Sequence, residues 1–262
     1  MSKTAKRSRV PEFVEKKRRG EKIAVLTAYD ATMARLMDRA GVDALLVGDS
    51  LGVVVAGSET TLEVTMEMMV HHTRSVANGT KHALVIADMP FLSYQPSVAD
   101  AIRNGGRLLA EGHAAAVKLE GGRPMAETVA RMVEVGIPVM GHLGLTPQSV
   151  NALGGYRRLS AKETDSLVED AKLLEQAGAF SIVLEMVPAE VAKEITAAVA
   201  VPTIGIGAGP HCDGQVLVSY DAFGLFDEFV PSFVKRYAEL GQQVTDATKA
   251  YVAEVKDGRF PK

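Results

Sequence analysis

The chain has 262 residues, 47% of them hydrophobic, which is enough to bury the core of one large α/β domain or of two small ones. A formal net charge of −3 gives no general electrostatic attraction to nucleic acid or to a membrane surface, so we expect neither partner. The single cysteine, Cys212, excludes an internal disulfide framework, and no apolar run reaches membrane-spanning length, so we expect a cytoplasmic protein.

The opening stretch, MSKTAKRSRVPEFVEKKRRG, is strongly basic. A run of this kind can be an RNA-binding arm or a targeting segment, but the charges of a short basic helix are more often simply solvated. We therefore predict a lead-in over about residues 1–20, containing a short helix whose charges face water.

Short β-branched runs alternate with helical stretches along the rest of the chain, an order typical of parallel strands joined by helical crossovers. The predicted strands begin at Ile23, Asp43, Ala83, Ala115, Ile137, Phe180, Val201 and Gln215. Between them lie predicted helices such as ATMARLMDRAG, SVADAIRNGGRLLAEG and SAKETDSLVEDAKLLEQAG, the last with a Ser-x-x-Glu start at Ser160 and a glycine end. Eight such units close a (β/α)8 TIM barrel in about 250 residues, so we predict a single barrel domain over residues 1–262.

The connection between the last two predicted strands is unusually short. Only AGPHCDG, residues 208–214, separates them, whereas a parallel crossover normally needs a dozen or more residues. Either the helix there has shrunk to a turn or the number of strands is wrong, and a doubly wound open sheet remains the alternative fold.

Polar residues gather where the predicted strands end, at the face that carries the active site of a barrel. They are Tyr29, Asp30, Asp49, Ser50, Asp88, Lys118, Glu120, His142, Glu185 and Asp221. Side chains two apart on a strand share a face, which groups Asp88 with Ile86, Glu120 with Lys118, Glu185 with Val183, and Asp49 with Leu45 and Val47.

Three of these carboxylates, Asp49, Asp88 and Glu120, would come from successive strands about 4.8 Å apart. Carboxylates so close repel one another, and a hard divalent cation relieves the repulsion. Ligands that are all oxygen favour Mg²⁺ over Zn²⁺ and leave positions for water or substrate. Taken singly, each has a simpler interpretation: Asp49 as a cap, Asp88 in a turn before Pro90, and Glu120 as an ion-pair partner.

Lys118 and Glu185 are predicted to serve chemistry on a bound molecule. The Lys118 ammonium can reach a substrate carboxylate or a developing enolate oxygen, although it can also form an ordinary ion pair with Glu120. Glu185, across the barrel from the metal ligands, is placed to remove a proton, with a surface salt bridge as the alternative. His142 is either a hydrogen-bond partner of Glu185 or substrate, or a satisfied core histidine. These residues indicate metal-assisted proton abstraction next to a carbonyl.

Three other features of the sequence give weaker evidence about function. Adjacent residues on a helix do not share a face, so His71 and His72 are not expected to bind a metal together. GIGAG, residues 205–209, is interpreted as a tight strand exit rather than a phosphate loop. The segment FDEFVPSFVKRYAEL, residues 226–240, is predicted to be a helix whose exposed apolar residues are candidates for a subunit interface.

An ordered set of motifs gives a second line of inference. LLVGDSLG, ADMPFLSYQ, VKLEGG, GHLGLTPQSVNALGGY, LEMVPAE and GIGAG together resemble those of the ketopantoate hydroxymethyltransferase family, from about Glu21 to the VKDGRFP ending. The resemblance implies a (β/α)8 barrel of the phosphoenolpyruvate mutase and isocitrate lyase superfamily, bound Mg²⁺, and a large homo-oligomer, suggested to be a decamer. It also implies transfer of a hydroxymethyl group from methylenetetrahydrofolate to 3-methyl-2-oxobutanoate, giving 2-dehydropantoate for pantothenate synthesis.

Carried over by motif, the resemblance implies a role for each of the residues singled out above. Asp49, Asp88 and Glu120 would be metal ligands, and Glu185 the proton acceptor. The substrate contacts would be Asp49, Ser50, Asp88 and Lys118. The motifs do not locate the folate site. Two alternatives remain: another Mg²⁺-dependent lyase or mutase of 2-oxo acids from the same superfamily, and a catalytically silent metabolite-binding barrel.

Overall fold

The computed structural model describes residues 8–155 and 164–261, and its centre is a closed barrel of parallel strands in sequential order. The strands are β1 Ile23–Thr27, β2 Ala44–Val47, β3 Leu84–Asp88, β4 Ala116–Glu120, β5 Val139–Gly144, β6 Ser181–Glu185, β7 Thr203–Ile206 and β8 Gly214–Leu217. All eight predicted strands are present, so the predicted (β/α)8 barrel is confirmed and the open sheet was the wrong alternative. The chain divides into two compact units, up to Val216 and from Leu217 onward.

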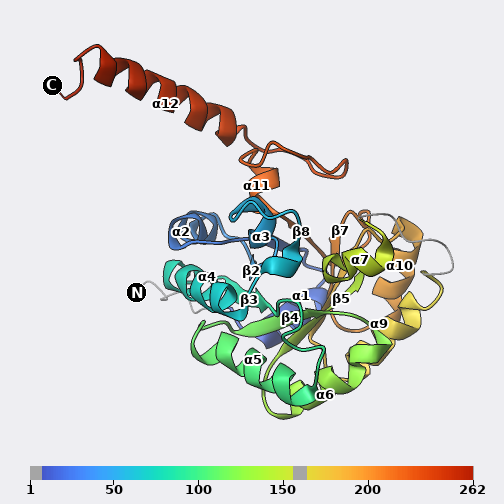
Figure 1. Cartoon of the computed structure of the whole chain (residues 1–262). Helices are drawn as coiled ribbons and strands as arrows, with labels where there is room; N and C mark the ends of the chain where they lie inside the picture. Colours follow the sequence, from blue (N-terminus) through green and yellow to red (C-terminus); the bar gives the residue numbers. More distant parts are fainter. Residues whose placement is uncertain (1–7, 156–163, 262) are drawn as a thin grey trace, which may run out of the picture. The chain divides into compact units, whose positions relative to one another are not determined.

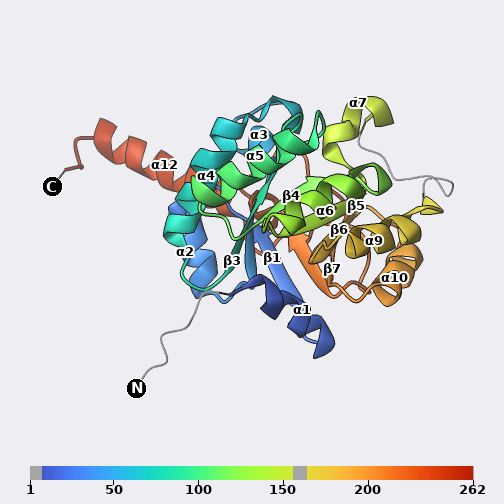
Figure 2. The same ribbon diagram turned by 90° about the horizontal axis from the view of Figure 1, so that it is seen from below.

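Helices surround the barrel in the first unit (Figures 1 and 2). They are α1 Val10–Arg18, α2 Ala31–Arg39, α3 Leu51–Val54, α4 Met66–Gly79, α5 Val98–Ala110, α6 Ala126–Glu134, α7 Val150–Leu153, α9 Leu167–Gln176 and α10 Ala189–Ala198. Short 3-10 turns lie at Thr61–Glu63 (η1), Arg123–Met125 (η2) and Pro147–Ser149 (η3). Successive outer helices pack on one another, as in the pairs α2 with α4, α5 with α6 and α9 with α10. The Ser160 start predicted for the helix before β6 lies outside the described residues.

Side-chain caps fix where several outer helices begin. Asp30 accepts hydrogen bonds from the backbone N–H groups of Thr32 and Met33, and Ser97 accepts one from Asp100. Such caps satisfy backbone donors that have no partner inside the helix. Asp30, one of the polar residues noted at the strand ends, is therefore explained by helix capping.

The connection between β7 and β8 contains no helix. It runs from residue 207 to residue 213, and Gly207 and Gly209 both take left-handed backbone conformations, with φ of +62° and +77°. Glycine adopts these values without the steric cost that a side chain would bring. The crossover has thus shrunk to a tight turn, and β7 and β8 still pair in parallel, with Ile204 opposite Gly214.

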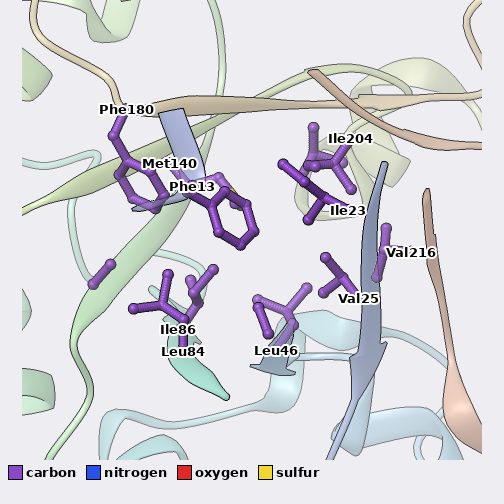
Figure 3. Packing of buried hydrophobic residues seen from close by; sticks show 13 residues of the cluster. Phe13, Ile23, Val25, Leu46, Leu84, Ile86, Met140, Phe180, Ile204 and Val216 are labelled. Carbon is purple, nitrogen blue, oxygen red and sulfur yellow. The ribbon is translucent and has the colours of Figure 1, made fainter. Parts of the chain in front are cut away.

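Alternate residues of the strands fill the barrel interior (Figure 3). The buried cluster includes Ile23, Val25, Ala44, Leu46, Leu84, Ile86, Ala116, Met140, Val183, Ile204 and Val216. The two-residue periodicity groups Asp49 with Leu45 and Val47 on one face of β2, and this face was predicted to be the interior one. That prediction was wrong, because Ala44 and Leu46 face the barrel interior. Leu45 and Val47 are also completely buried, so hydrophobicity could not tell the two faces apart.

The basic N-terminal segment does more than face water. In α1, Phe13 belongs to the barrel cluster and its ring meets that of Phe180 edge-on, with the ring centres 6.0 Å apart. Lys17 Nζ lies 3.0 Å from Asp213 Oδ2, and Lys16 Nζ lies 2.9 Å from Asp43 Oδ1. Asp43 and Asp213 directly precede β2 and β8, so α1 covers the N-terminal end of the barrel. In barrels of this kind that face serves stability.

The second unit contains α11 (Ser219–Ala222) and α12 (Leu240–Lys256). The helix predicted over residues 226–240 was wrong: the segment 226–239 is irregular and α12 begins only at Leu240. Pro231 accounts for the difference, since proline donates no backbone hydrogen bond and disfavours helical backbone in the residue before it. No helix in the described ranges has the length and apolarity needed to span a bilayer.

Asp38, buried at the end of α2, gives a stability prediction. Its Oδ1 accepts hydrogen bonds from His82 N (2.9 Å) and Ala83 N (2.7 Å), and its Oδ2 from Lys81 N (3.0 Å). Burial raises the pKa of Asp38, but these three donors outweigh it and lower the pKa overall. Asp38→Asn places an amide donor opposite a backbone donor, so we expect unfolding by urea to show a loss of about 1–3 kcal/mol.

The pH dependence has a definite sign. Because the folded pKa of Asp38 lies below the unfolded value, its stabilising contribution is present above the unfolded pKa, about 4, and is lost as pH falls through the folded pKa. The gap between the wild type and Asp38→Asn should therefore be constant near pH 7 and shrink below about pH 4. A gap that stays constant down to pH 3 would contradict this account.

Candidate active site

Four strands deliver polar side chains at their carboxyl ends, on the face that lines the barrel. Lys118 and Glu120 continue the interior face of β4 above Ala116, and His142 continues that of β5 above Met140. Asp88 and Glu185 end β3 and β6 in the same way, above Ile86 and Val183. The register sets Asp88 beside Lys118 and Glu120 beside His142.

Asp49 and Ser50 come from the turn that follows β2 rather than from the strand itself. The Asp49 backbone N–H donates to Asp88 Oδ2 at 3.1 Å, which ties this turn to the end of β3. A Cβ on Gly48 would lie 2.7 Å from Ser50 Oγ, so a side chain there would displace the Ser50 hydroxyl. Ser50 Oγ lies 2.9 Å from the hydroxyl of Tyr29, at the end of β1.

Lys118 is buried among carboxylates. Its Nζ lies 3.1 Å from Asp88 Oδ1 and 3.2 Å from His142 Nδ1, so its closest acidic contact is Asp88 rather than the Glu120 partner considered above. Burial alone would lower the pKa of Lys118, but the three surrounding carboxylates outweigh it and raise the pKa. Lys118 therefore supplies a permanent positive charge inside the barrel mouth.

Asp49 and Asp88 are held in an environment that disfavours their charged forms. Burial, followed by the charges of Asp88 and Glu120, raises the pKa of Asp49 well above its usual range. Burial also raises the pKa of Asp88, although Lys118 and the Asp49 N–H act against it. Both pKa shifts show that ionising all the carboxylates of this buried pocket is unfavourable. A bound proton or cation would therefore stabilise the pocket.

His142 lies between two glutamates. Its Nε2 is 3.3 Å from Glu185 Oε2 and its Nδ1 is 3.5 Å from Glu120 Oε1. Burial and the nearby lysine charge would lower the pKa of His142, but the two glutamates outweigh them and raise it to about 9. The structure thus places His142 beside Glu185, one of the partners considered for it, at ion-pair distance.

The end of β5 runs very close to the end of β6. Gly144 has a φ of +101°, and a Cβ there would lie 2.1 Å from the Glu185 carbonyl oxygen. Only glycine allows this approach, which also lets Leu145 N donate to the same oxygen at 2.8 Å. The backbone of Glu185 is thereby fixed, while its side chain remains 19% exposed towards solvent.

Two site residues were missed from the sequence, Tyr94 and Gln148. Gln148 donates from its backbone N to Glu120 Oε2 (3.0 Å) and from Nε2 to Asp49 Oδ2 (2.9 Å). Tyr94, buried after β3, contacts both Gln148 and the Glu120 backbone. Both belong to motifs quoted above, ADMPFLSYQ and GHLGLTPQS, and a large polar residue soon after a barrel strand was the available signal.

No ready-made metal cluster accompanies these contacts. Within residues 8–155 and 164–261, no group of three or more His, Cys, Asp or Glu side chains is arranged so that it could hold a metal ion. The oxygens of Asp49, Asp88 and Glu120 are instead engaged by Gln148 and Lys118.

The remaining candidates lie outside this cluster. His72 Nδ1 contacts the Tyr29 carbonyl oxygen at 2.7 Å, and the ring of His71 meets that of His72 edge-on within α4. Cys212 is buried, and burial raises the pKa of its thiol, which disfavours the thiolate that a nucleophilic cysteine needs. Asp221 belongs to α11 in the second unit.

A closed (β/α)8 barrel with carboxylates, a lysine and a histidine gathered at the carboxyl ends of its strands has the architecture of a barrel enzyme. Solved structures share the fold at low sequence identity. One is 2,3-dimethylmalate lyase, a member of the phosphoenolpyruvate mutase/isocitrate lyase superfamily (TM-score 0.62, 18% identity, 95% of this chain and 88% of that chain). Another is a phosphoenolpyruvate phosphomutase from Streptomyces platensis (TM-score 0.60, 15% identity, 94% and 88%).

Sequence comparison identifies the family within this fold. The chain belongs to the ketopantoate hydroxymethyltransferase family, which it matches over residues 7–262. It is 58% identical to the 3-methyl-2-oxobutanoate hydroxymethyltransferase of Syntrophus aciditrophicus, over 94% of this chain and 91% of that protein. It is 57% identical to the enzyme of the same name from Caldicellulosiruptor saccharolyticus, over 94% of each. The resemblance inferred from the motifs is confirmed.

Proposed function

We propose that this chain transfers a hydroxymethyl group to 3-methyl-2-oxobutanoate, with methylenetetrahydrofolate as the one-carbon donor, and that it forms 2-dehydropantoate for pantothenate synthesis. The donor supplies the methylene carbon and water supplies the hydroxyl oxygen, so tetrahydrofolate is the other product. The observation that carries the proposal is the buried cluster of Asp49, Asp88, Lys118 and Glu120 facing the His142–Glu185 pair, in a member of this family.

We further propose that Asp49, Asp88 and Glu120 bind Mg²⁺. Asp49, Asp88 and Glu120, when ionised, face the positive charge of Lys118, which leaves an excess of two negative charges that a divalent cation matches. The donor set, made of oxygen atoms only, fits Mg²⁺ by its chemistry. When bound, the cation would polarise the keto oxygen of the substrate and stabilise the enolate.

The protein side chains have separate tasks in this reaction. Lys118, Ser50 and the aspartates bind the keto acid at the barrel mouth, where the lysine offsets negative charge developing on the substrate oxygen. Glu185 removes the proton from C3, so the electrons of the broken C–H bond form the enolate, and C3 then attacks the methylene carbon of the donor as one of the two folate C–N bonds of that carbon breaks and its nitrogen takes up the proton. Water replaces the second folate nitrogen as the hydroxyl group and gives that nitrogen its proton, so tetrahydrofolate leaves. His142, 3.3 Å from Glu185, orients the glutamate.

We also propose that the chain works as a homo-oligomer. Helix α12 has no buried residue in the single chain, although it carries large apolar side chains. Val244, Tyr251 and Val255 are each 44% exposed or more. Apolar area of this kind is typical of a surface that a partner covers.

Proton NMR of 3-methyl-2-oxobutanoate in deuterated water tests the proposed function. With enzyme and Mg²⁺ the C3 proton should exchange, and 2-dehydropantoate should form only when methylenetetrahydrofolate is added. Exchange without a folate-dependent product would indicate another 2-oxo acid enzyme. Neither exchange nor product would indicate a barrel that binds metabolites without catalysis.

A further inference from the structure

Gln148 is the most highly connected side chain of the site, although it carries no charge. It lies on η3, directly after β5, and is 6% exposed. Its backbone and amide together make five hydrogen bonds. The partners are Glu120 Oε2 (3.0 Å), Asp49 Oδ2 (2.9 Å), the Met89 carbonyl oxygen (2.9 Å), the Tyr94 hydroxyl (2.8 Å) and Gln95 Nε2 (2.9 Å).

The partners of the amide determine its orientation. An ionised carboxylate and a carbonyl can only accept, so the amide nitrogen must face Asp49 and Met89. On the other side, the backbone N–H of Glu120 donates to the Tyr94 oxygen at 3.0 Å, which leaves the phenolic proton to be donated. Its nearest acceptor is Gln148 Oε1 at 2.8 Å, closer than the Glu120 carbonyl oxygen at 3.2 Å.

The position of Gln148 matters because it contacts two of the three clustered carboxylates. It takes one oxygen of Asp49 and one of Glu120, and the other Glu120 oxygen lies 3.5 Å from His142 Nδ1. A lysine or arginine in this place could also donate to Asp49, but its charge would cancel part of the negative potential. A neutral amide fixes the orientation and keeps the charge, whereas Lys118 already offsets Asp88.

We propose that Gln148 is a positioning residue, whose side chain orients Asp49 and whose backbone N–H orients Glu120 for the cation, and that Tyr94 fixes the orientation of the Gln148 amide. This inference rests on the proposed function, since it assigns a cation to that same site. Tyr94 and Gln148 also join the segment after β3 to the segment after β5, so the two loops orient the carboxylates together.

The test measures Mg²⁺ binding without substrate, by calorimetry, on Gln148→Leu, Tyr94→Phe and the control Gln176→Leu, which changes an exposed glutamine on α9. Gln148→Leu removes the side-chain hydrogen bond to Asp49 and keeps the backbone hydrogen bond to Glu120. A hydrogen bond to a charged group is strong enough that the loss of the first should weaken Mg²⁺ binding about tenfold or more. Tyr94→Phe should weaken it by a smaller factor, and the control should bind Mg²⁺ like the wild type.

A second measurement separates positioning from general stability. Gln148→Leu should need more Mg²⁺ for half-maximal exchange of the C3 proton, while its exchange rate at saturating Mg²⁺ falls much less. Folded Gln148→Leu with wild-type Mg²⁺ affinity would overturn the inference and leave the proposed function intact. Absence of exchange in the wild type itself would overturn both. If Gln148→Leu does not fold, Tyr94→Phe decides, and wild-type Mg²⁺ affinity in that variant overturns the inference.

Discussion

Glu185→Gln is expected to abolish exchange of the C3 proton of 3-methyl-2-oxobutanoate with deuterated water, reducing the rate by about a thousandfold or more. An amide has the shape of the carboxylate but cannot accept the proton, so binding of the keto acid and of Mg²⁺ should change little. The side chain lies at the end of β6, apart from Asp49, Asp88 and Glu120 in the fold, which is why the two effects should separate. Proton NMR follows the exchange, and calorimetry follows the binding.

The matched control is Glu190→Gln, which makes the same chemical change on the exposed surface of α10, where the carboxylate lies 3.9 Å from Lys193. It should exchange the proton at the wild-type rate. Exchange that persists in Glu185→Gln would show that another group is the base. His142, 3.3 Å from Glu185, would then be the next residue to change.

The regular part of the fold could be predicted because each strand is a short buried run between polar turns. Even the short link before β8 was recognisable, although only the structure shows that two left-handed glycines make it fit. The errors arose where hydrophobicity could not show which face of an element points into the barrel. Both faces of β2 are buried, so its inward face could not be chosen, and the role of Phe13 in closing the barrel depends on a contact with the distant Phe180.

The site was predictable to the extent that it lies on strands. Residues two apart on one strand share a face, and this rule alone places Lys118 with Glu120 and links Asp88 to the barrel interior. It says nothing about partners from loops. Tyr94 and Gln148 reach the carboxylates through the irregular segments after β3 and β5, whose backbone paths no periodicity encodes. The pairing of Lys118 with Asp88 was missed for a different reason, because it depends on the register between β3 and β4.

Glu120→Gln should weaken Mg²⁺ binding by about a hundredfold and reduce the exchange and transfer activities together. The variant keeps an acceptor for the Gln148 backbone N–H but removes one negative charge from a buried site, where an unscreened charge contributes strongly to the binding of a divalent cation. Raising the Mg²⁺ concentration should restore part of the activity, since the proton acceptor Glu185 is intact.

Glu127→Gln on the exposed surface of α6 makes the same change in charge and should leave Mg²⁺ affinity within about twofold of the wild type, because solvent and salt screen an exposed charge. Calorimetry gives both affinities, and the rise in melting temperature on adding Mg²⁺ gives an independent measure, because a ligand stabilises the state that binds it. Equal affinities in the two variants would place the cation away from Glu120. An affinity lost in Glu120→Gln alone would instead locate it at the carboxyl ends of the barrel strands, next to Lys118 and opposite Glu185.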